Sequence, residues 1–95
     1  MDQPQASITV RLSGRLARSE LPAICERVTG LLERACPPVI YCEVATVAAD
    51  AVTIDALGQL QLLARRYGCR LKLRDVSDEL RELIEWAGLQ RVLAE

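Results

Sequence analysis

The segment from Val39 to Leu73 changes from a strand pattern to a helix pattern and back, and this change constrains the fold more than any other feature. Its first six residues, VIYCEV, are almost all apolar, which is typical of a strand covered on at least one face. Apolar residues then recur at helical spacing up to Gly68, which is placed to end a helix in a left-handed conformation. The expected inward residues of this helix are Ile54, Leu57, Leu60, Leu63, Ala64 and Tyr67. The strand pattern RLKLRDV follows, and this order predicts parallel neighbours in an α/β layer fold.

The residues before this segment predict one more strand. In SITVRLSGRL, the apolar residues Ile8, Val10 and Leu12 alternate with polar ones, as in a half-buried strand. Gly14 breaks the pattern, and we expect a short hairpin arm at Leu16.

Two further helices are expected on either side of the central segment. The first begins at an N-cap on Ser19 and runs to about Ala35, because the prolines that follow forbid its continuation. The last is capped by Ser77 and ends at Gly88. The residues LQRVL, at positions 89–93, are expected to add a short edge strand.

The length of 95 residues predicts one domain. Apolar residues make up 51% of the chain and aromatic residues only 3%, so the core must be aliphatic. The polar start, which contains a proline, predicts a flexible tail over residues 1–6 and a single domain over residues 7–95.

The composition argues against several classes of function. The chain has no His, and therefore lacks the commonest general base and the commonest metal ligand. Its 12 basic and 13 acidic residues give a net charge of −1, which provides no long-range field for nucleic acid. No apolar run approaches the roughly 18–20 residues that span a bilayer. We therefore expect a cytoplasmic protein that does not insert into a membrane.

The four cysteines are expected to have structural roles. Cys25, Cys36, Cys42 and Cys69 match no zinc spacing and form no C-x-x-C pair. Most of them fall in stretches that look buried, where cysteine behaves as a small apolar residue. We expect no metal, no cofactor and no catalytic residue. A Cys-dependent transferase is a further hypothesis, but no acid–base partner for any thiol can be named.

The best candidate for a site is the turn at Asp50, which follows one strand and precedes a helix. Ligands of open α/β sheets bind beyond the carboxyl ends of the strands, and helix N-termini favour anions. The alternative is that Asp50 or Thr53 only caps the helix, with Asp55 completing its first turn. Ala51 and Val52 carry no reactive atom, so the turn favours recognition over chemistry.

Two other features are weaker candidates. A basic cluster is best explained as a solvated helix end and strand edge, and it consists of Arg65, Arg66, Arg70, Lys72 and Arg74. The single tryptophan, Trp86, is expected to pack in a satellite core, although a lone tryptophan can also anchor an interface.

Taken in order, these segments resemble the STAS domain, named for sulphate transporters and anti-sigma factor antagonists. LSGRL, at residues 12–16, is similar to the early strand of that family with its glycine, and VIYCEV is similar to the central strand. Asp50 falls where the family has the Asp of its Asp-Ser-Ser/Thr-Gly-Leu motif, and the count from Asp50 to Gly68 and RLKL fits without a gap. VSDELRELIEWAGLQRVL resembles the closing signature, in which a helix ends in Gly-Leu before a short strand.

The resemblance implies both a fold and a function. The fold is α/β, with a small mixed sheet of four to five strands and about three helices mainly on one face. The function is that of a non-enzymatic anti-sigma factor antagonist, a bacterial regulator of transcription that binds an anti-sigma factor or a related kinase-like ATPase. In that family the kinase phosphorylates a Ser or Thr at the start of the helix, and the added charge ejects the antagonist.

The sequence departs from the family motif at this switch. Ala51 replaces the first Ser, Val52 replaces the usual phosphoacceptor and Thr53 replaces the Gly. Because valine cannot be phosphorylated, we expect partner binding without a switch. The expected docking surface consists of Asp50, Ala51, Val52, Thr53 and Asp55, with the adjoining loop after LSGRL. A slip of one residue would make Thr53 a phosphosite, although the gap-free spacing argues against it.

A second hypothesis keeps the fold and changes the partner. Stand-alone STAS domains that resemble this one also serve as cytoplasmic accessory subunits of lipid-transporting ABC systems, where they bind the ATPase. The residues alone leave both partners open.

Overall fold

The structure, a computed structural model, describes residues 8–35 and 37–88. In chain order the elements are β1 (Ile8–Gly14), the short 3-10 helix η1 (Arg18–Glu20), α1 (Leu21–Ala35), β2 (Val39–Val47), α2 (Ala51–Arg66), β3 (Arg70–Arg74) and α3 (Asp78–Trp86). The alternation of strands and helices confirms the α/β class and the three helices expected from the sequence. The expected tail over residues 1–6, the expected edge strand over 89–93 and Cys36 lie outside the described residues.

The sheet has the order β1-β2-β3, and both pairs of neighbours are parallel. The expected parallel neighbours are therefore present, but the mixed strand directions implied by the resemblance do not occur among the described strands. Those residues form three strands, and the expected four to five are not confirmed. The hairpin arm expected at Leu16 is also absent, because the chain passes from Gly14 through a short loop into η1 and α1.

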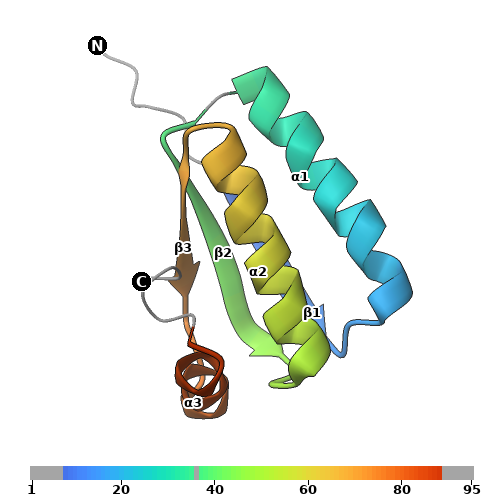
Figure 1. The fold of residues 1–95 in the computed structure, drawn as a ribbon, viewed down its shortest axis with the longest axis vertical. Coiled ribbons are helices and arrows are strands. Elements are labelled where there is room, and N and C mark those ends of the chain that lie inside the picture. Colours follow the sequence, from blue (N-terminus) through green and yellow to red (C-terminus); the bar gives the residue numbers. More distant parts are fainter. Residues whose placement is uncertain (1–7, 36, 89–95) are drawn as a thin grey trace.

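Helices α1 and α2 lie side by side against one face of the sheet, and α3 lies beyond the carboxyl end of β3 (Figure 1). Between the sheet and these two helices is an aliphatic core. It includes Val28 and Leu32 of α1, Ile40, Cys42 and Val44 of β2, Leu57 and Leu60 of α2, and Leu71 and Leu73 of β3. The alternate residues of each strand point to the other face, where Arg11 and Arg74 are exposed.

The helix ends follow the local chemistry of the sequence. Ser77 caps α3 by accepting a hydrogen bond from the Leu80 N–H at 3.1 Å, as expected. Gly68 has φ of 75° and ends α2 in the left-handed region, where glycine has no steric penalty. Tyr67 was expected on the inward face, but α2 ends at Arg66, and the exposed Tyr67 hydroxyl donates to Glu33 at 2.9 Å.

Candidate partner-binding site at the start of helix α2

The first turn of α2 is fixed by Asp50. The backbone of Asp50 is extended, and its Oδ1 accepts a hydrogen bond from the Thr53 N–H at 2.9 Å. One orphan donor of the helix N-terminus is satisfied in this way, so Asp50 is an N-cap. The Ala48 N–H donates to the carbonyl of Gly14 at 2.8 Å, which ties the turn before α2 to the end of β1.

The predicted partner-binding residues do not all reach the surface. Ala51 is exposed, and Asp50, Val52 and Asp55 are half-buried. Thr53 is fully buried, at 0% exposure, and its Oγ1 has no hydrogen-bond partner within the described part of the chain. Thr53 therefore supports the helix from inside and adds nothing to a docking surface. Its role as a phosphosite stays a prediction, and a kinase could reach the hydroxyl only if this turn opened.

Asp55 is joined to the segment that follows LSGRL, which was expected beside the start of this helix, through a contact that the sequence did not predict. Arg18 of η1 donates through Nη1 to Asp55 Oδ2 at 2.7 Å, and both side chains are partly exposed. Gln59 donates to the other oxygen of Asp55 at 3.4 Å. Arg18 and Asp55 are 37 residues apart in the sequence, so only the packing of η1 beside α2 brings them together. No local sequence pattern predicts this ion pair.

We use the name α2 tip for Asp50, Ala51, Val52 and Asp55. Of its two carboxylates, Asp50 is engaged with a backbone N–H and Asp55 with a guanidinium. Ala51 and Val52 add a small apolar surface between them. No thiol, hydroxyl or amine belongs to this set, and both of its carboxylates are already engaged in hydrogen bonds or an ion pair.

Cys25 and Cys42 do not offer reactive thiolates at neutral pH. Burial, and secondarily the charge of Glu43, raises the pKa of Cys42 to about 12. Burial also raises the pKa of Cys25, with a smaller effect from the nearby carboxylate of Asp55. Residues 8–35 and 37–88 contain no group of three or more His, Cys, Asp and Glu side chains that could hold a metal ion.

The two weaker candidates from the sequence, the basic cluster and Trp86, both lie at the surface of the structure. In the basic cluster, the Arg74 guanidinium lies over the ring of Tyr41, 3.9 Å from its centroid, on the sheet face that α1 and α2 leave uncovered. Trp86 is 89% exposed, so its expected place in a satellite core is wrong. The reason is its position at the last residue of α3, past the buried residues Leu80 and Ile84.

In the described part of the chain, no helix is both long enough and apolar enough to cross a bilayer.

Comparison with known proteins gives one clear result. A family model described as "Mlab, STAS domain" matches residues 1–94, which is nearly the whole chain. A search of curated proteins found no match. Domains of this kind are in general binding modules without catalysis. The chain therefore belongs to the STAS domain family.

Proposed function

We propose that this chain is a non-enzymatic module that docks on another protein through the α2 tip. The observation that carries the proposal is the exposure of Ala51 beside half-buried Val52 and Asp50, at the carboxyl end of a parallel sheet. A small apolar surface flanked by carboxylates suits recognition, since the apolar atoms are desolvated on contact and the charges select the partner.

The docking is constitutive. Val52 stands in the acceptor position of the family motif, and the nearest hydroxyl, that of Thr53, is buried. A phosphate at this point would add nearly two negative charges beside Asp50 and break a docked complex. Without an accessible acceptor, the α2 tip has no such release step.

Two partner classes follow from the family. The first is an anti-sigma factor or a related kinase-like ATPase, so that the chain regulates bacterial transcription from the cytoplasm as a permanently active antagonist. The second is the ATPase of a lipid-transporting ABC system, with this chain as an accessory subunit. The buried Thr53 favours the second class, because a subunit that stays in its complex needs no switch for its release.

The test compares variants that change the α2 tip with one that changes the same helix elsewhere. Ala51→Arg places a long charged side chain on the tip, and we expect it to abolish recovery of the partner by affinity purification and mass spectrometry. Leu62→Arg is the matched control, since Leu62 is 67% exposed and lies about 16 Å further along α2. The recovered partner, with a kinase-like fold or a Walker A loop, identifies the class.

Asp50→Asn separates charge from capping. Asparagine caps a helix about as well as aspartate, so the fold should keep its thermal stability while the negative charge is lost. We expect partner binding to weaken at unchanged stability. Equal partner recovery from wild type, Ala51→Arg and Leu62→Arg would show that the docking surface lies elsewhere.

A further inference from the structure

One side of strand β1 faces no other described strand. Among these strands β1 pairs only with β2, so the backbone N–H and C=O groups on its other side have no partner strand within residues 8–35 and 37–88. Such an edge can accept another extended chain through main-chain hydrogen bonds. The register of β1 on β2 is regular from Ile8 to Arg11 and shifts between Arg11 and Ser13. The regular part is the segment best suited to strand addition.

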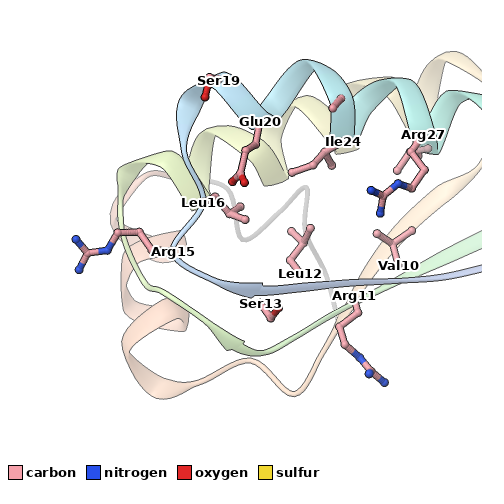
Figure 2. A pocket seen from close by; sticks show the side chains of 12 residues that line it. Val10, Arg11, Leu12, Ser13, Arg15, Leu16, Ser19, Glu20, Ile24 and Arg27 are labelled. Atoms are coloured by element: carbon pink, nitrogen blue, oxygen red, sulfur yellow. The ribbon is translucent and has the colours of Figure 1, made fainter.

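A groove runs beside this open edge, between β1 and α1. Its cavity volume is about 450 Å³. Val10 and Leu12 of β1 point into it from one side and Ile24 of α1 from the other, and Leu16 lies at its end (Figure 2). An added strand would place every second side chain on the α1 side of the sheet, which is the side of these apolar residues.

The charges around the groove are mainly positive. Arg11, Arg15 and Arg27 line it with a single acid, Glu20, but the Arg11 side chain points to the other face of β1 and the Arg15 side chain extends outward past the end of the groove (Figure 2). The Glu20 carboxylate already accepts a hydrogen bond from the Ala17 N–H at 2.8 Å, and Arg11 is paired with Glu43 at 3.1 Å. Arg15 and Arg27 have no ion pair within residues 8–35 and 37–88, and the Arg27 side chain is directed toward the groove (Figure 2).

We propose that this groove, here named the β1 edge groove, binds an extended acidic segment of a partner protein as a fourth strand. Apolar side chains of the segment fill the space between Val10, Leu12 and Ile24. Its carboxylates meet Arg15 and Arg27, which lack acidic partners of their own. The proposal goes beyond docking at the α2 tip, because it concerns the edge of β1 and the groove between β1 and α1.

Charge also decides against a second copy of the chain as the occupant. Two β1 strands paired antiparallel about their middle residue would bring two Arg11 side chains together, and like charges directly opposite are destabilising. Both copies would add their Arg15 and Arg27 to the same interface. An acidic segment has the complementary charge.

The test is a titration of the ¹⁵N-labelled full chain with a blocked heptapeptide that has valine and leucine at positions 3 and 5, glutamate at positions 1 and 7, and threonine at positions 2, 4 and 6. In an added strand, the apolar and the acidic side chains of this peptide share the face toward α1. We expect amide shifts along β1 and the first half of α1. A peptide with lysine in place of glutamate should not bind, and one with a central proline should bind poorly, because proline removes a strand hydrogen bond.

Charge-reversal variants of the arginines beside the β1 edge groove locate the peptide-binding site. Arg15→Glu and Arg27→Glu should each weaken binding of the acidic peptide by about three- to tenfold, as loss and reversal of a rim ion pair imply. Arg34→Glu, with the same change of charge at the far end of α1, should bind as wild type does. Equal binding of the lysine peptide, shifts confined to the α2 tip, or a dimer in sedimentation that the peptide does not dissociate would each overturn the proposal. Docking of the main partner at the α2 tip is tested separately, by the Ala51 variants.

Discussion

At the scale of single residues, the burial of Thr53 supports the proposal that the start of α2 is a contact surface without a phosphorylation switch. Its side chain is fully buried, and its hydroxyl has no partner in the described part of the chain. A buried hydroxyl without a hydrogen bond has lost its water and gained nothing in return. The Thr53 hydroxyl therefore slightly lowers the free energy of unfolding, whereas the apolar atoms of the side chain pack in the core.

This leads to a prediction for Thr53→Val, which replaces the hydroxyl by a methyl group of similar shape. We expect the free energy of unfolding to rise by about 1 kcal/mol, since the desolvation cost of the hydroxyl disappears. Urea denaturation measures the change. Thr29→Val is the matched control: the Thr29 hydroxyl donates to the Cys25 carbonyl at 2.8 Å, so this variant should lose about 0.5–1 kcal/mol. A loss of stability in Thr53→Val as large as that in Thr29→Val would mean that the Thr53 hydroxyl has a partner in solution.

Most residues that act on their own backbone neighbours were predicted well from the sequence, but Ser19, expected as the N-cap of the first helix, lies inside the 3-10 helix η1. Asp50 and Ser77 are caps, and Gly68 ends a helix, because each of these roles depends on a few adjacent residues. The pair of Arg18 and Asp55 could not be predicted, because it depends on how two segments pack. The exposure of Trp86 could not be predicted either, because the helical period alone does not say where the packed part of a helix ends.

At the scale of elements, β2 is the central strand of the described sheet, and its burial has a chemical consequence at Cys42. The side chain is fully buried, and the pKa of the thiol is raised to about 12. In the unfolded chain the same thiol ionises near 9.0. The unfolded chain thus loses this proton at a lower pH than the folded chain does.

The sign of the resulting pH dependence follows directly. The contribution of Cys42 to stability is fully present below pH 9 and declines as the pH rises toward about 12. The decline is about 1 kcal/mol for each pH unit in this window. Chemical denaturation at several pH values between 8 and 11 measures it, and Cys42→Val should show a shallower decline. Equal slopes for the two proteins would mean that the folded thiol ionises near its ordinary pKa.

At the scale of the whole molecule, the α/β class and the parallel neighbours of β2 could be predicted, because hydrophobic periodicity reports which faces are buried. The strand directions that the resemblance implied are not confirmed: it implied a mixed sheet, and the three described strands are all parallel. Periodicity carries no information about which strand lies at an edge. The open side of β1, and with it the β1 edge groove, therefore emerged only from the structure.

The arrangement gives the molecule two separate surfaces. The α2 tip lies where β2 leads into α2, and the β1 edge groove lies between β1 and α1 (Figures 1 and 2). Gly14 is the last residue of β1, and its backbone carbonyl accepts a hydrogen bond from the N–H of Ala48, just before α2. This bond connects the regions of the two surfaces. Under the two proposals above, one module contacts its main partner at the α2 tip and an extended segment at the β1 edge groove.

The most direct test of docking through the α2 tip is site-specific photocrosslinking in the cells that produce the protein. A photoreactive phenylalanine analogue is placed at Ala51 in one variant and at Leu62, on the same helix, in the other. The account predicts one covalent adduct with a defined ATPase or anti-sigma factor from position 51 and none from position 62. No adduct at position 51, or the same adduct from both positions, would contradict it.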